Sequence, residues 1–329
     1  MNKKLLFIGA IFILVVILVI LASRQSSPAQ TTAPSVRPTL AAPAPTTIFT
    51  QPSNVTFSFA ASPTIPTSLP SYTVQPMPLS SIEQIAEQST AALALGATPS
   101  ALTRGDSYTE TWSRPNEAAL TITKTNNLTT LSFRQIKSKR PPNVLAPGAA
   151  AQQFLALLVP PTEGLVVRVT GTTNGPFNGL LVLDSPAPTS FTNYYYSYFL
   201  DDYPILTTGL SISPASVIAD DGGVVRFASV VPPPSSLQIG TPVALLTVNQ
   251  VLASLMAGRG TLLDTHNPET PDQGVVPNFS KFIIEDAKVV YAPKEAQLLP
   301  ALYMTGTGTA TGGATQKATI FLWLTVGSP

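Results

Sequence analysis

The chain has 329 residues, of which 44% are hydrophobic and 11% are charged, and its formal net charge is +1. This length and hydrophobic content allow one large domain or two to three small ones, and they exclude disorder throughout. The weak net charge argues against a nucleic-acid partner. Because cysteine is absent, disulfides, thiolate metal sites, cysteine nucleophiles and a lipoprotein acylation site are excluded.

An apolar run without charges, Leu5–Ala22, is the first strong feature. As a helix it measures about 27 Å, close to the thickness of the hydrocarbon core of a bilayer. We predict a cytoplasmic tip over residues 1–4 and an uncleaved transmembrane helix over residues 5–23. Lys3 and Lys4 favour an N-terminus inside the cell, hence a single-pass protein of the cell membrane with an extracytoplasmic globular region. The alternative is a cleaved secretory signal, whose apolar region is normally shorter, about 7–15 residues.

Residues 24–78 are rich in Pro, Thr and Ser, with eleven prolines between Ser26 and Pro78. Such a segment buries too little apolar surface to offset the entropy of ordering, so we predict a disordered stalk. Within it, the alternation in Asn54–Ala60 is typical of a strand that adds to the folded part.

The folded region is predicted to begin at Leu79, in a first unit over residues 79–145. Ser80 and Glu83 are spaced as a capping box, and Gly96 is placed to end the helix. Alternating residues then predict three antiparallel strands. They are Tyr108–Ser113, Ala118–Thr125 and Leu128–Ile136.

A second, β-rich unit is predicted over residues 146–246, and a third, α+β unit over residues 247–329. The second begins with the apolar run Ala149–Leu158 and has a hairpin turn at Asp220-Asp221-Gly222-Gly223. Its predicted strands are Leu165–Thr170, Leu180–Asp184, Tyr194–Leu200, Val217–Ala219 and Val224–Ala228. In the third, Thr247 and Gln250 predict a capped helix that ends at Gly258. Strands Phe282–Tyr291, Ala301–Thr305 and Ala318–Val326 follow, with Gly306–Gly313 as a loop. The expected fold class is therefore α+β, with tandem helix-plus-antiparallel-meander units behind a transmembrane helix and a stalk.

No residue pattern indicates a catalytic site, a cofactor site or a metal site. The single histidine, His266, lies near Asp264, Glu269 and Asp272, and such a loop can hold calcium, but the spacing of an EF-hand is missing and a solvated turn is the favoured interpretation. A G-x-S-x-G elbow is absent. The close acid pairs are sequence neighbours, Asp201-Asp202 and Asp220-Asp221, and do not form a pair of facing carboxylates. We therefore expect no enzyme.

An aromatic run, Phe191–Tyr203, is the most unusual local feature. Alternation places Tyr194, Tyr196 and Tyr198 on one strand face and Tyr195, Ser197 and Phe199 on the other. Exposed tyrosines stack on sugar rings or anchor a protein partner. The possible binding surface is Tyr194, Tyr196, Tyr198 and Tyr203. In the alternative interpretation, both faces of this strand are covered.

Three segments over roughly the last 140 residues resemble the membrane-anchored YycH/YycI regulatory proteins and the related PepSY-like extracytoplasmic modules. They are Tyr198–Gly209, Ile284–Pro293 and Leu299–Met304. The resemblance implies a non-enzymatic module, anchored by one helix, that restrains a sensor kinase or binds another envelope protein. A glycine of the family's aromatic step is missing at Asp201-Asp202-Tyr203-Pro204-Ile205, and the long stalk also departs from the family.

The expected function is thus binding or regulation of an envelope protein or a cell-wall component, without cofactors. The alternative is a surface module that binds a glycan or a small ligand through the aromatic strand. A hydrolase remains a third, less favoured hypothesis, since a fold does not determine function.

Overall fold

The computed structural model describes residues 47–48, 55–104, 107–125, 128–135, 145–175, 190–207, 210–266, 279–310 and 312–325. The apolar run Leu5–Ala22 and most of the predicted stalk lie outside these residues. Within the described part of the chain, no helix has both the length and the hydropathy needed to cross a membrane.

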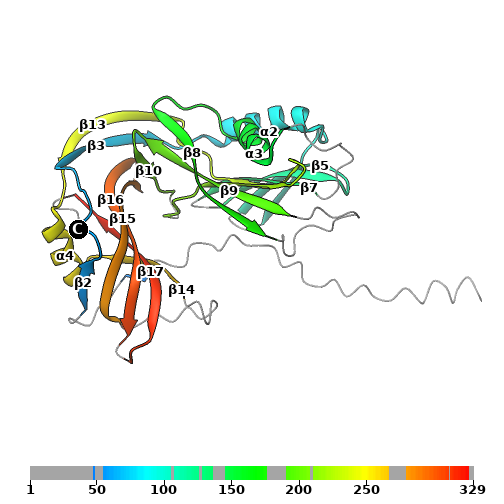
Figure 1. Cartoon of the computed structure of the whole chain (residues 1–329). Coiled ribbons are helices and arrows are strands. Elements are labelled where there is room, and N and C mark those ends of the chain that lie inside the picture. Colours follow the sequence, from blue (N-terminus) through cyan, green and yellow to red (C-terminus); the bar gives the residue numbers. More distant parts are fainter. Residues whose placement is uncertain are drawn as a thin grey trace, which may run out of the picture. The chain divides into compact units, whose positions relative to one another are not determined.

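Within the described residues the chain forms three helices, and two of them cover the same group of strands. Helix α2 spans Leu79–Leu93 and α3 spans Pro147–Leu158. Figure 1 shows α2 and α3 close together over one face of the strands. The third helix, α4 (Val248–Met256), begins with the predicted capping box, because Thr247 Oγ1 accepts from Gln250 N and Thr247 N donates to Gln250 Oε1.

Eight strands pair in one antiparallel array, which we call the N-terminal array. Its spatial order is β4-β5-β6-β7-β12-β11-β9-β8. The strands are β4 (Ser100–Arg104), β5 (Ser107–Arg114), β6 (Ala118–Lys124), β7 (Thr129–Gln135), β8 (Leu165–Gly175), β9 (Phe191–Leu200), β11 (Ala215–Asp220) and β12 (Val225–Val230). Alternate residues of β6 and β7 are buried, as period-two patterns predict, so one face packs under α2 and α3.

The remaining strands build a second array around a long hairpin formed by β15 (Phe279–Lys294) and β16 (Gln297–Ala310). On the β16 side lie β17 (Thr315–Trp323), β14 (Thr261–His266) and β1 (Thr47–Ile48), while β2 (Thr56–Phe59) runs parallel to β15. A two-stranded ribbon of β3 (Ser68–Gln75) and β13 (Ser236–Ala244) contacts the start of β16.

A short strand, β10 (Tyr203–Ile205), joins the two arrays. It forms a hairpin with β9 and pairs in parallel with β15 through Ile205 and Tyr291. Ladder pairings therefore connect all seventeen described strands into one mixed sheet. The far end of the β15–β16 hairpin contributes Tyr291 and Leu298 to the core under α2 and α3.

The predicted fold class is wrong, because the chain is mostly a large mixed sheet rather than a series of tandem helix-plus-meander units. Strands pair across the predicted unit boundaries: β7 of the first unit pairs with β12 of the second, and β3 pairs with both β13 and β16. Threonine, valine and tyrosine favour strands, and these pairings satisfy edges that separate meanders would leave open.

Residues 55–78, assigned to the stalk, contain β2 and β3. The strand expected within Asn54–Ala60 is confirmed, because β2 pairs with Lys281–Ile284 of β15. Val55 and Phe57 are buried beside Phe282, which supplies the apolar burial that the segment cannot obtain alone. The described fold thus includes residues that precede Leu79.

Two local predictions also need correction. The N-cap of helix α2 is Pro78, which makes no side-chain hydrogen bond, so the predicted capping box of Ser80 and Glu83 is not formed. The helix ends at Ala94, whose φ is 53°, rather than at Gly96. The predicted loop Gly306–Gly313 is largely strand, since β16 continues to Ala310. Gly306 and Gly308 face Phe282 and Phe279, whose rings occupy the space of the missing side chains.

Candidate ligand-binding site

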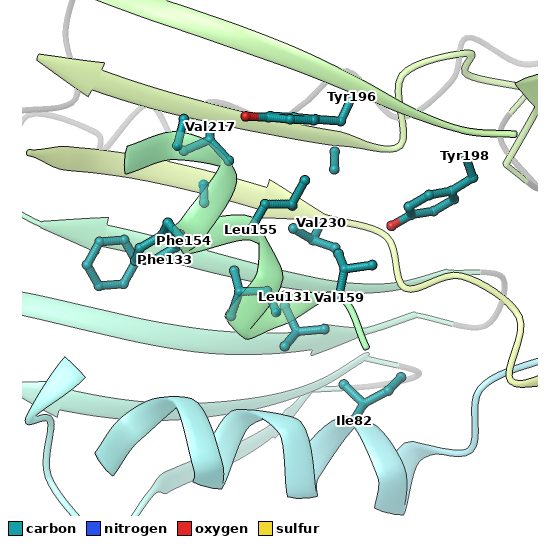
Figure 2. Packing of buried hydrophobic residues seen from close by; sticks show 14 of the residues in the cluster. Ile82, Leu131, Phe133, Phe154, Leu155, Val159, Tyr196, Tyr198, Val217 and Val230 are labelled. Atoms are coloured by element: carbon teal, nitrogen blue, oxygen red, sulfur yellow. The ribbon is translucent and has the colours of Figure 1, made fainter. Parts of the chain in front are cut away.

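Strand β9 carries the aromatic run, and its two faces have different environments. Tyr196 and Tyr198 are only 2% and 3% exposed and belong to the core beneath α3. Figure 2 shows both tyrosines in the same cluster of buried side chains as Leu155 and Val230. Tyr194, on the same face, is half-buried with its ring against Gly148 at the start of α3. For Tyr196 and Tyr198, the alternative of a covered face therefore holds.

The two buried tyrosines differ in how their hydroxyl groups are satisfied. Tyr198 donates to the carbonyl oxygen of Val231 at 2.7 Å, whereas the Tyr196 hydroxyl has no hydrogen-bond partner among the described residues. Burial, with a contribution from Tyr194, raises the pKa of Tyr196 to about 12. Burial also raises the pKa of Tyr198. Both groups are neutral at physiological pH, which suits a structural role.

The opposite face of β9 lines a pocket with a volume of about 650 Å³. Tyr195 and Phe199 come from β9, and Tyr203, the last of the predicted surface tyrosines, comes from β10. The other walls come from β8, the β9–β10 turn, β10, β15, the β2–β3 connection and the segment before β11. They contribute Thr64, Thr170, Gly171, Asp202, Pro204, Ile212, Ser213, Lys288 and Val289. The pocket lies where β10 joins the two arrays.

Each aromatic side chain of the pocket contacts a neighbour. Tyr195 has its hydroxyl 3.4 Å from Thr173 Oγ1. The guanidinium carbon of Arg168 lies 4.8 Å from the centre of the Phe199 ring. Tyr203 packs edge-on against Tyr291, with ring centres 6.2 Å apart. Phe199 and Tyr203 thus each have a close ring contact, whereas the contact of the Tyr195 hydroxyl is long and exposed.

A two-residue turn, Asp201-Asp202, connects β9 to β10, and Asp202 of this turn lines the pocket. Arg168 binds this turn through both terminal nitrogens. Its Nη1 lies 3.2 Å from Asp202 Oδ1, and its Nη2 donates to the Asp201 carbonyl oxygen at 3.0 Å. Asp201 has a positive φ of 54°, which aspartate tolerates better than most residues. The two carboxylates therefore belong to a turn and not to a strand.

The pocket has one charged group of each sign. Asp202 is largely exposed, and Lys288 Nζ lies 3.0 Å from Asp286 Oδ2 in an ion pair whose partners are both more than half exposed. Exposed pairs of this kind contribute about 0–1 kcal/mol, so Lys288 can exchange Asp286 for a ligand atom at little cost. The pocket can thus both donate and accept hydrogen bonds.

The second acid pair, Asp220-Asp221, has the predicted turn role and an unpredicted buried ion pair. Asp220 is 3% exposed, and its Oδ2 accepts from Arg226 Nε at 2.8 Å while its Oδ1 accepts from Val224 N at 2.8 Å. The predicted hairpin is confirmed by β11 and β12, with Gly223 in the left-handed region at φ 72°. This pair fixes the hairpin and lies outside the pocket lining.

The loop considered as a calcium site lies mostly outside the described residues. His266 ends β14, while Glu269 and Asp272 lie outside the described residues. No cluster of three potential metal ligands occurs among the residues that the structure describes.

Sequence reasoning named Tyr195 and Phe199 only as the second face of the aromatic strand, and missed most of the pocket. Lys288, Thr170 and Thr64 lie far apart along the chain and have no local signal. The chain matches no protein-family model and no curated protein.

Proposed function

We propose that the chain is a non-enzymatic binding protein of the cell envelope, and that its folded part binds a small ligand in the pocket beside β9. The observation that supports this proposal is the pocket itself, in which Tyr195, Phe199 and Tyr203 line a volume of about 650 Å³. Small-ligand sites commonly measure about 300–1,000 Å³ and combine aromatic walls with a few polar groups.

A binding role fits the polar groups of this pocket better than catalysis. Its carboxylate, Asp202, is largely exposed and held by Arg168, and its ammonium, Lys288, is already paired with Asp286. Each group is already part of an ion pair and keeps further hydrogen-bonding atoms, since a carboxylate accepts at two oxygens and an ammonium donates three hydrogens. Both are therefore suited to hydrogen bonding with a ligand.

The proposed location rests on the N-terminal sequence. Leu5–Ala22 is long enough to serve as a membrane anchor, with Lys3 and Lys4 inside the cell. We expect added protease to digest a C-terminal tag on the full-length chain in intact spheroplasts. Protection of the tag until the membrane is lysed would overturn the extracytoplasmic location.

The pocket is tested with the full-length chain in detergent, screened by thermal melting against small polar compounds that include amino acids, nucleosides and sugars. Gly171 lines the pocket, its φ lies outside the left-handed region, and the nearest atom to an added Cβ is Tyr195 Cδ2 at 3.9 Å. Gly171→Leu therefore fills the pocket without a backbone clash. Gly175→Leu is the matched control, because an added Cβ there meets nothing within 4 Å and Gly175 does not line the pocket.

We expect compounds that raise the melting temperature of the wild type and of Gly175→Leu but not that of Gly171→Leu. Stabilisation that persists in Gly171→Leu would show that the compounds bind elsewhere. A screen without any stabilising compound would overturn the small-ligand function.

The edge of β8 favours a second candidate function, binding of another envelope protein, as the YycH/YycI resemblance implies. Among the described strands, β8 pairs with β9 alone. Val166 and Val169 on this strand are 47% and 52% exposed. An extended segment of a partner, such as a sensor-kinase ectodomain, can add to an unpaired edge through main-chain hydrogen bonds.

This second candidate is tested in membranes by photo-crosslinking. A crosslinking amino acid replaces Thr172, which is exposed on β8, or Gln152, which is exposed on α3 as the control. A discrete adduct with an envelope protein from position 172 alone is expected. Equal labelling from both positions would contradict docking at β8.

A further inference from the structure

We infer that the ligand of the pocket is an uncharged saccharide; this inference rests on the proposed function. The pocket combines three aromatic side chains with one carboxylate, one ammonium and several hydroxyl groups. Each of these features limits the chemistry of the ligand.

The paired charges argue against a charged ligand. Asp202 and Lys288 line the same pocket, and each is already paired with an opposite charge, Asp202 with Arg168 and Lys288 with Asp286. An anion that approaches Lys288 therefore also meets a carboxylate, and a cation that approaches Asp202 also meets a positively charged side chain. A charged ligand would in addition lose part of its hydration on entry, and an ionised group loses the most. A neutral ligand avoids both penalties.

The hydrogen-bonding groups favour hydroxyls on the ligand. Asp202 only accepts hydrogen bonds and Lys288 only donates them. A hydroxyl group does both, so a polyhydroxylated compound can satisfy the two residues in any order around its ring. Thr64 and Ser213 also line the pocket and add hydroxyls that can donate or accept.

The aromatic walls favour a ring with apolar faces. A pyranose presents C–H groups on its faces and hydroxyls around its edge, and aromatic side chains bury such faces well while Tyr supplies a polar handle. In the pocket, Phe199 contacts the Arg168 guanidinium and Tyr203 contacts the Tyr291 ring, while Tyr195 exposes its ring on the same lining. A wholly apolar ligand would displace water from Asp202 and Lys288 without replacing the hydrogen bonds that water makes beyond their ion pairs.

The test measures binding of trisaccharides to the full-length chain in detergent by isothermal titration calorimetry. Three neutral probes are used: N-acetylglucosamine trimer, cellotriose and maltotriose. Two charged probes of the same length are the deacetylated glucosamine trimer, a cation, and the galacturonic acid trimer, an anion. The proteins are wild type, Gly171→Leu and Gly175→Leu.

We expect at least one neutral trisaccharide to bind the wild type and Gly175→Leu equally and to lose at least about tenfold in affinity with Gly171→Leu. Both charged trimers should bind at least about fivefold more weakly than that neutral probe. In addition, Asp202→Asn should strengthen binding of the anion relative to the wild type, since it removes a carboxylate from the pocket and releases the Arg168 guanidinium that this carboxylate pairs with.

Two outcomes would overturn the inference while the proposed function stands. One is preference for a charged trimer that is lost in Gly171→Leu. The other is failure of all saccharides while other compounds still stabilise the chain in a Gly171-dependent way. If no compound of any class responds to Gly171→Leu, both the inference and the small-ligand function fail.

Discussion

Tyr195 and Tyr196 are consecutive residues of β9, and their side chains lie on opposite faces of the sheet, Tyr195 at the pocket and Tyr196 in the core under α3. Successive residues of a regular strand alternate in this way. In β9, helix α3 covers one face, and the pocket lies at the other. The aromatic run therefore contributes to two environments: Tyr196 and Tyr198 belong to the core, while Tyr195 and Phe199 line the pocket.

The two buried hydroxyl groups predict different outcomes for the same substitution. Tyr198→Phe should lower the free energy of unfolding by about 1 kcal/mol, because it leaves the Val231 carbonyl without its donor. Tyr196→Phe should be neutral or stabilising by up to about 1 kcal/mol, since its hydroxyl is buried without a partner among the described residues. Urea denaturation of both variants gives the comparison, and equal losses would contradict the assigned difference.

Tyr196 also predicts how stability changes in alkali. Its native pKa is about 12 against an ordinary value of 10.0, so between these pH values the unfolded chain releases a proton that the native chain keeps. The free energy of unfolding should fall as pH rises from about 10, and the contribution of Tyr196 should be lost above about 12. Tyr196→Phe should decline less steeply than the wild type in urea titrations across this range. Parallel declines would contradict the raised pKa.

The buried Asp220–Arg226 pair predicts a large effect of removing one partner. Arg226→Met leaves the Asp220 carboxylate, 3% exposed, without its countercharge and should lower the free energy of unfolding by about 3–5 kcal/mol. Lys288→Met is the control, because its ion pair with Asp286 is exposed and should contribute less than about 1 kcal/mol. Chemical denaturation measures both. Similar small losses would mean that water reaches Asp220.

Gly306 of β16 and Gly312 of the turn after β16 predict different responses to an added methyl group. A Cβ at Gly306 would overlap the carbonyl oxygen of Ile283, which cannot move without shifting β15. Gly306→Ala should therefore destabilise the chain by about 1–3 kcal/mol. Gly312→Ala, where an added Cβ meets nothing within 4 Å, should be neutral or slightly stabilising. Thermal melting of the two variants measures the difference. A Gly306→Ala variant with the melting temperature of the wild type would contradict the close packing of β15 on β16.

Arg168 does not line the pocket, but it holds two residues that do. Its guanidinium covers Phe199 and bonds the Asp201-Asp202 turn, which a lysine cannot do simultaneously. Arg168→Lys should weaken the best-binding neutral trisaccharide about fivefold, equivalent to about 1 kcal/mol, with little change in melting temperature. Arg104→Lys, an exposed arginine on β4, is the control. Unchanged affinity in Arg168→Lys would show that the turn is positioned without it.

Several local features followed from short stretches of sequence. Alternation predicted β5, β6 and β7 close to their observed ranges, and Asp220 to Gly223 predicted the hairpin of β11 and β12. Thr247 and Gln250 predicted the start of α4. Each of these depends on contacts between residues only a few positions apart, so the information lies within one window of the chain.

The pairings between distant strands did not follow from the sequence. β2 and β10 both join β15, from positions more than 140 residues apart, and β3 pairs with β13. Alternating patterns show that a strand has two faces and two edges, but every strand of similar pattern is an equally good partner until the whole chain competes for the same edges. The predicted tandem units failed for this reason.

By itself, the sequence determined the composition, the apolar N-terminal run, the capped helix α4 and the alternation that divides the tyrosines of β9 into two rows. Only the tertiary structure decided which row is covered. Helix α3 packs over Tyr196 and Tyr198 because their face is continuous with the apolar faces of β11 and β12, whereas β10 and β15 meet beside Tyr195 and Phe199 and leave a pocket. Burial is a property of the assembled core, which forms from residues far apart in the chain.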